Sequence, residues 1–149
     1  MHPDASAAYP DPAMGIEVKL DPDPKSVRAA RAFVETNLRA LGFPESVDDR
    51  VLIVSELSTN ALNAAVDTPF LVVVRVDAER HPVIEVHDSS PEAPKPRPPD
   101  FVSEGGRGLP VVDALCAAWT CVPSGSGKAV IATLRGRQEV GPTAKSPVG

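Results

Sequence analysis

Aromatic residues are scarce in this sequence and make up only 4% of its 149 positions. A hydrophobic core must therefore consist mainly of valine, leucine, isoleucine and alanine, which the apolar fraction of 42% supplies. A chain of this length buries roughly two-thirds of its unfolded surface, so it can fold as one domain without a disulfide or a metal. Long apolar runs are also missing, since no stretch of about 18 apolar residues occurs, which excludes a membrane-spanning helix.

Cysteine and basic charge are equally sparse. Cys116 and Cys121 are the only two cysteines and have no histidine nearby, which favours two small buried residues in a reducing compartment over a zinc site. The net charge of -5, the pI near 5.1 and the lack of a basic stripe argue against a nucleic-acid partner. The first residues are acidic and lack the apolar segment of a signal peptide, so we expect a cytoplasmic protein.

Proline, by contrast, is abundant and clustered. Residues 1–14 and 137–149 are rich in Pro, Gly, Ser and Ala, and we expect both to be disordered tails around a domain at 15–136. A third proline-rich stretch, at 89–104, lies inside the domain. It is too polar for a core element and too long for an ordinary connection, so it is predicted to be a lid or a binding loop.

The remaining segments predict an alternation of helices and strands. Two amphipathic helices follow a short strand, a β-hairpin comes next, and a third helix after the proline-rich segment leads into two more strands. Few parallel crossovers fit this order, so we expect an α+β fold with two layers. The predicted ranges are 15–20, 69–76, 83–87, 119–122 and 129–134 for the strands, and 23–40, 45–66 and 109–117 for the helices.

The second predicted helix carries polar side chains next to an apolar frame. Glu56, Asn60 and Asn63 are spaced i, i+4 and i+7, so they share one face. When the helix is considered alone, a solvated face is the favoured explanation of the three residues. If that face is packed, a carboxylate and a carboxamide there should line a polar site, and an Asn carbonyl oxygen is a suitable Mg²⁺ ligand.

Two further stretches carry candidate binding groups. Asp88 closes a predicted strand, where it could start a turn or accept a hydrogen bond from an exocyclic amine of a ligand. Gly105, Gly106 and Gly108 surround Arg107 directly before the third helix, so their N–H groups could bind an anion, although a simple turn is an equal alternative. The stretch G-S-G-K at 125–128 lies between two strands and predicts a hairpin turn.

Taken together, E-L-S-T-N-A, D-S-S-P and G-G-R-G-L resemble the N, G1 and G2 boxes of the GHKL (Bergerat-fold) ATP-binding domains of histidine kinases and DNA gyrase. This resemblance implies a two-layer sandwich with a mixed, mostly antiparallel sheet covered by helices on one face. It also implies that Asn60 holds Mg²⁺, that Glu56 is the general base and that Asp88 accepts the adenine amino group. The other ATP-binding positions that it implies are Asn63, Gly105, Gly106, Arg107, Gly108 and Leu109, with residues 89–104 as the ATP lid.

Within that fold, the chain is most similar to the small anti-sigma-factor serine kinases of the RsbW/SpoIIAB type, and its composition resembles actinobacterial members. The resemblance implies a Mg-ATP-dependent protein-serine/threonine kinase. Its partner would be a sigma factor, a STAS-domain anti-anti-sigma protein, or both, and relatives often form homodimers. The alternative is a non-catalytic regulator in which ATP binding to the lid controls a protein interface.

The chain departs from this branch at several positions. Ser89, Ser90 and Pro91 replace the glycines that follow the G1 aspartate in larger relatives. Glu104 stands where the kinases carry an arginine that contacts the terminal phosphate, and Ala129 takes the place of a threonine near the adenine. These differences weaken the expectation of phosphotransfer more than they weaken the expectation of nucleotide binding.

Overall fold

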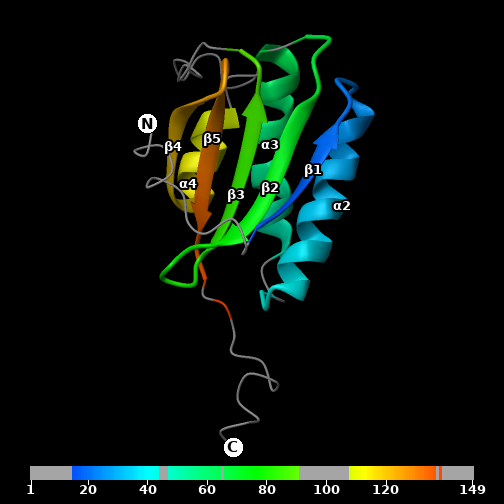
Figure 1. The fold of residues 1–149 in the computed structure, drawn as a ribbon. Coiled ribbons are helices and arrows are strands. Elements are labelled where there is room, and N and C mark those ends of the chain that lie inside the picture. Colours follow the sequence, from blue (N-terminus) through cyan, green and yellow to red (C-terminus); the bar gives the residue numbers. More distant parts are fainter. Residues whose placement is uncertain (1–14, 44–46, 65, 91–107, 137, 139–149) are drawn as a thin grey trace, which may run out of the picture.

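The computed structural model describes residues 15–43, 47–64, 66–90, 108–136 and 138, except for the side chains of 47, 48 and 108–111. Strands form one layer and helices the other (Figure 1). In chain order the elements are β1 (Ile16–Leu20), α2 (Lys25–Ala40), α3 (Val47–Ala64), β2 (Phe70–Val76), β3 (Pro82–Asp88), α4 (Gly108–Leu115), β4 (Cys116–Ser124) and β5 (Gly127–Leu134).

The sheet has the order β1-β2-β3-β5-β4, and every pair of neighbouring strands is antiparallel. The predicted α+β two-layer architecture is thereby confirmed. The other predicted boundaries lie within two residues of the observed ones, and the largest difference is at β4, which begins at Cys116, where a helix was expected to continue to Ala117. A register irregularity between Cys116 and Ala118 lets the chain pass directly from α4 into the strand.

The hydrophobic core lies between the helices and one face of the sheet. Alternate residues of β2, namely Phe70, Val72 and Val74, point into it, as the period of two in a strand requires. On α2, Ala30, Val34 and Leu38 follow one another at helical spacing along the buried stripe. α3 and α4 complete the helical layer, with Ile53, Leu57, Ala61 and Val112 among their buried residues.

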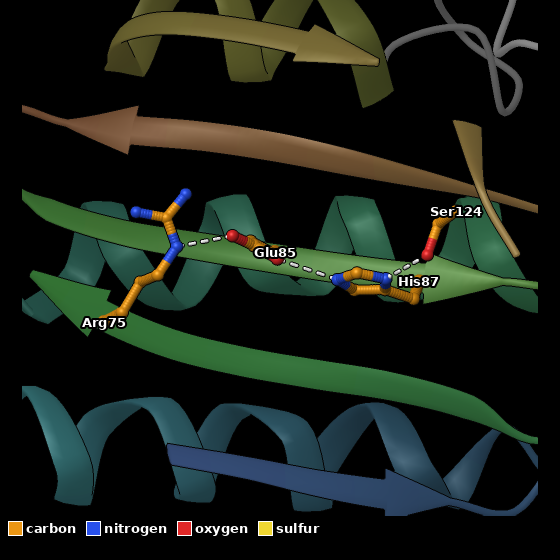
Figure 2. A network of polar contacts seen from close by, with 4 residues as sticks. All are labelled: Arg75, Glu85, His87 and Ser124. Atoms are coloured by element: carbon orange, nitrogen blue, oxygen red, sulfur yellow. Dashed lines mark hydrogen bonds and ion pairs between the residues drawn. The ribbon is translucent and has the colours of Figure 1, made fainter. Parts of the chain in front are cut away.

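The other face of the sheet carries a chain of polar contacts that links strands β2, β3 and β4 (Figure 2). Arg75 Nε donates to Glu85 Oε2, and Glu85 Oε1 lies 2.7 Å from His87 Nε2. His87 Nδ1 in turn lies 2.8 Å from the hydroxyl oxygen of Ser124. Arg75 and Glu85 are both almost fully buried, so this network places an ion pair inside the outer surface of the sheet.

The last described residue, Gln138, falls in the segment assigned to the C-terminal tail. Its side chain donates to the carbonyl of Leu41 over 2.7 Å, and its backbone N–H donates to the carbonyl of Arg80. These contacts attach the end of the described chain to the loop after α2 and to the β2–β3 turn. None of the helices in the described ranges is long and apolar enough to cross a bilayer.

Candidate functional site

Several elements that carry the predicted site end at the same end of the sandwich. Figure 1 shows the C-terminal end of α3, the end of β3 and the turn between β4 and β5 all at one edge of the molecule. This arrangement follows from the topology, because β3 is antiparallel to β5 and β4 is antiparallel to β5. The end of β3 and the start of β5 therefore meet, and we refer to this edge as the β3 end.

On α3, two of the three predicted residues lie at the border of the core. Glu56 and Asn60 are half-buried, while Asn63 is exposed. The buried stripe of the helix includes Leu57 and Ala61, each one position after one of this pair. Glu56 and Asn60 thus flank the packed stripe on the same side, as the i, i+4 spacing predicted. The exposure of Asn63 makes it the weakest of the three as a ligand-binding residue.

Asp88 lies at the end of β3, where the sequence placed it, and it is deeply buried. Its two carboxylate oxygens lie 2.9 and 2.8 Å from the ammonium nitrogen of Lys128. Oδ1 also accepts the backbone N–H of Ser90 over 2.7 Å, which makes Asp88 a turn residue as well. The sequence allowed Asp88 either to start a turn or to accept a hydrogen bond from a ligand amine. One carboxylate can do both, because the turn uses only part of its hydrogen-bonding capacity.

The two charged side chains face the helices. Asp88 and Lys128 are direct partners in the β3–β5 register. Val86, two residues before Asp88, and Val130, two residues after Lys128, both belong to the core between sheet and helices. Side chains two positions apart in a strand share a face. The ion pair therefore lies on the helix-facing side of the sheet, next to the hydrophobic core and closer to the β3 end.

Gly127 holds the two strands close together at this point. A Cβ atom built on Gly127 would lie 1.9 Å from the carbonyl oxygen of Asp88 and 2.6 Å from the Cα of Ser89. Real Cβ atoms do not approach backbone that closely, so only glycine fits here. The predicted G-S-G-K hairpin turn is confirmed as the β4–β5 connection, and its last glycine also seats the backbone of Asp88.

The sequence pattern assigns Lys128 only to the end of the predicted turn. The position expected to lie near the adenine was Ala129, but its side chain belongs to a small cluster with Val83 and Ile131 on the outer face of the sheet. Lys128 is the residue that contacts Asp88. The sequence carries no local signal for this, because Ala129, Val130, Ile131 and Ala132 are all apolar and do not show which residues of the strand face the helices.

The half-buried thiol of Cys121 lies close enough to this ion pair to respond to it. Burial raises the pKa of Cys121, the charge of Lys128 lowers it and the charge of Asp88 raises it again, with a net upward shift. Burial likewise raises the pKa of Cys116, which lies at the other end of β4. Both cysteines are free thiols, as expected for buried residues of this kind.

The glycine-rich part of the site falls mostly outside the described residues. Gly105, Gly106 and Arg107 lie there, as does the predicted lid after Ser90 and its flanking Glu104. Gly108 is the first residue of α4, which agrees with a glycine-rich turn that leads directly into a helix. The side chain of Leu109 is likewise not described.

A cavity of about 210 Å³ lies away from all these residues. It is lined by the start of α3, the end of α4 and the end of β5, with Asp49, Arg50 and Arg135 as its charged groups. These segments lie opposite the β3 end, because α3 and β5 run through the domain between the two edges. The cavity is therefore separate from the candidate site.

The α+β sandwich, with an antiparallel sheet in one layer and helices in the other, is consistent with a domain of the GHKL type. Residues 20–134 match the family described as the histidine kinase-like ATPase domain, and the chain belongs to that family. The match covers every described strand and helix except part of β1. Membership implies ATP binding, generally with Mg²⁺. No curated protein matches the chain.

The described residues fit such a ligand in their chemistry. Asn60 has a neutral side-chain oxygen of the kind that can bind a hard cation, and Glu56 is a carboxylate on the same side of α3. Asp88 offers a carboxylate acceptor for an amine, held in place by Lys128 and by the glycine contact behind it. These side chains are of the two kinds that a Mg-nucleotide site needs, an oxygen ligand for the cation and an acceptor for an amine.

Proposed function

We propose that the protein is an ATP-dependent protein-serine/threonine kinase of the anti-sigma-factor type, similar to RsbW and SpoIIAB. It binds a sigma factor, phosphorylates a serine on a STAS-domain anti-anti-sigma partner, or does both. The observation that carries this proposal is the placement of Glu56 and Asn60. Both are half-buried on one side of α3, in a domain whose family binds ATP.

The chemistry is a phosphoryl transfer in which positioning and charge neutralisation contribute most of the rate. Asn60 would hold Mg²⁺, and the cation would supply neutralisation of the phosphate charge. Glu56 accepts the proton of the attacking serine hydroxyl as the bond from that oxygen to the γ-phosphorus forms and the bond to the bridging oxygen of ADP breaks. Asp88 fixes the base at the other end of the nucleotide and takes no part in the transfer itself.

A non-catalytic regulator is the second candidate. Glu104 supports it, because the resembling kinases carry an arginine there that contacts the terminal phosphate, and a carboxylate repels that group. In this alternative, ATP binding still uses Asn60 and Asp88, and the consequence is an altered protein interface rather than a phosphorylated partner.

Transfer of label from γ-labelled ATP to candidate STAS proteins tests the two candidates. The purified protein is compared with Glu56→Gln, which keeps the shape of the side chain and removes the base, and with Asn60→Ala. We expect Glu56→Gln to reduce labelling by about 10²- to 10⁴-fold while ATP affinity stays within about threefold. Asn60→Ala should weaken Mg-ATP binding itself by about 10- to 100-fold.

Two matched controls separate these effects from general damage. Glu35→Gln changes a half-exposed glutamate on α2, and Thr59→Ala changes the exposed residue directly before Asn60 on α3. Both should behave as the wild type. If ATP binds but no partner is ever labelled, the regulator is the better description. If calorimetry detects no ATP binding at about millimolar concentration, the assignment of the site is wrong.

A further inference from the structure

The ion pair at the β3 end is more deeply buried than a surface salt bridge. The side chain of Lys128 is 5% exposed and that of Asp88 3% exposed. A buried ion pair of this kind is a weak contributor to stability, since apolar residues of similar size often serve as well or better. The ion pair lies at the end of the core and faces the helices. Since stability does not explain it well, we consider a role in ligand binding.

The hydrogen bonds of the pair leave part of its capacity unused. An ionised carboxylate has about four acceptor sites, and three are occupied by the two contacts from Lys128 and by the N–H of Ser90. An ammonium group has three donors, and two of them serve Asp88. Among the described residues, the pair thus retains one acceptor on Asp88 Oδ2 and one donor on Lys128 Nζ, side by side.

An acceptor next to a donor is the complement of one edge of adenine. The 6-amino group is a donor, and the neighbouring ring nitrogen N1 is an acceptor. Hypoxanthine presents the opposite order, with a carbonyl oxygen at position 6 and an N–H at position 1. Because the contact at Gly127 holds the backbone of Asp88 against β5, the order of acceptor and donor is set by the fold.

We propose that Lys128 is a specificity-determining residue of the nucleotide site, which donates a hydrogen bond to N1 of adenine while Asp88 accepts one from the 6-amino group. This inference rests on the proposed ATP-binding function. It adds a direct hydrogen bond from the protein to N1, next to the contact with the 6-amino group. The pairing of the two side chains across the strands pre-organises both groups before the base arrives.

Base analogues test this role by equilibrium binding, measured by calorimetry. Wild-type protein is titrated with ATP, with 1-deaza-ATP, which lacks the N1 acceptor, and with purine riboside triphosphate, which lacks the 6-amino group. We expect the wild type to bind 1-deaza-ATP roughly 10- to 100-fold more weakly than ATP, the range for one hydrogen bond to a charged group. The loss of the 6-amino group should cost a similar factor through Asp88.

The Lys128→Met variant keeps the length of the side chain and removes its donors. It should bind ATP as weakly as the wild type binds 1-deaza-ATP, and it should no longer distinguish the two nucleotides. It should still discriminate against purine riboside triphosphate, because Asp88 remains. Lys19→Met, which changes an exposed lysine on β1, is the matched control and should retain the full wild-type profile.

The outcomes separate the inference from the proposed function. Equal affinity of the wild type for ATP and 1-deaza-ATP overturns the role of Lys128 and leaves ATP binding intact. Retained discrimination in a folded Lys128→Met variant overturns it as well. If that variant does not fold, the analogue series on the wild type still decides the question. Failure of the wild type to bind any of the three nucleotides overturns the proposed function together with the inference.

Discussion

The two faces of the sheet each carry a buried ion pair, and the two pairs differ in what surrounds them. On the outer face, Glu85 is held on one side by Arg75 and on the other by His87, so both carboxylate oxygens have partners (Figure 2). On the helix-facing side, Asp88 is held by Lys128 and by a single backbone N–H. The first arrangement links three strands, while the second joins two strands at the edge where the candidate site lies.

This difference shows how a structural polar network can be told apart from a binding site in one small domain. In the outer network, Nη1 of Arg75 is a buried donor without a partner among the described residues, and Glu85 makes one hydrogen bond with each of its carboxylate oxygens. The inner pair presents an acceptor and a donor together. The outer pair also keeps unused hydrogen-bonding capacity, so burial, charge and capacity are insufficient criteria, and the position of the inner pair at the edge with the candidate site decides.

The largest effect is expected from Gly127→Ala, because it removes the strand contact that the inner pair needs. The added methyl group would overlap the carbonyl oxygen of Asp88, and backbone cannot move aside as a flexible side chain can. We expect little or no folded protein, measured by circular dichroism and urea denaturation. Gly125→Ala is the control in the same turn, where φ is +58° and no atom lies within 4 Å, so it should cost about 1 kcal/mol. Similar stability of the two variants would contradict this explanation.

The next effect concerns the outer network alone. Glu85→Ala leaves the guanidinium of Arg75 buried without its carboxylate, which should lower the free energy of unfolding by about 3–5 kcal/mol. Replacing both residues, as in Arg75→Leu with Glu85→Leu, should restore most of that loss. Urea denaturation measures the stability, and calorimetry of the folded protein should give an unchanged ATP affinity. An ATP affinity that falls with Glu85→Ala would show that the two faces are coupled.

A smaller effect is expected from pH. Burial would raise the pKa of Glu85, but the hydrogen bonds from His87 and Arg75 outweigh burial and hold it below the usual value of 4.5. The unfolded chain therefore binds the proton more readily, and the stabilisation is complete above about pH 4.5 and lost as the pH falls through the folded-state pKa. From about pH 6 to about pH 3, the wild type should lose more stability than Glu85→Gln in urea denaturation. Parallel pH profiles for the two proteins would contradict this role of the network.

Much of the fold could be predicted because local patterns carry it. Alternation predicted the strand at 15–20 and β-branched runs predicted those at 69–76 and 83–87, while the spacing of Val34 and Leu38 belongs to a helix stripe that is buried in the structure. The end of β3 at Asp88 was also expected, since a polar, proline-rich segment follows it. These features depend on residues that are close to one another in the sequence. Hydrophobic periodicity and the residue preferences of turns are sufficient to predict them.

The site was harder to predict because its parts are distant in the chain. Periodicity showed that Glu56, Asn60 and Asn63 share a face, but only the packing of α3 on the sheet and on α4 distinguished two half-buried residues from an exposed one. The partner of Asp88 is 40 positions away. Its identity depends on the register of β3 with β5, which no local pattern reports.

The sequence alone therefore determined the α+β class, most of the element boundaries, the position of Asp88 and the resemblance to an ATP-binding family. The tertiary structure decided that Lys128, rather than Ala129, faces that carboxylate. Side chains of a strand alternate between faces, so a shift of one residue in register would have exchanged the two. The contact between Gly127 and the backbone of Asp88 sets that register, and it forms only when the strands come together.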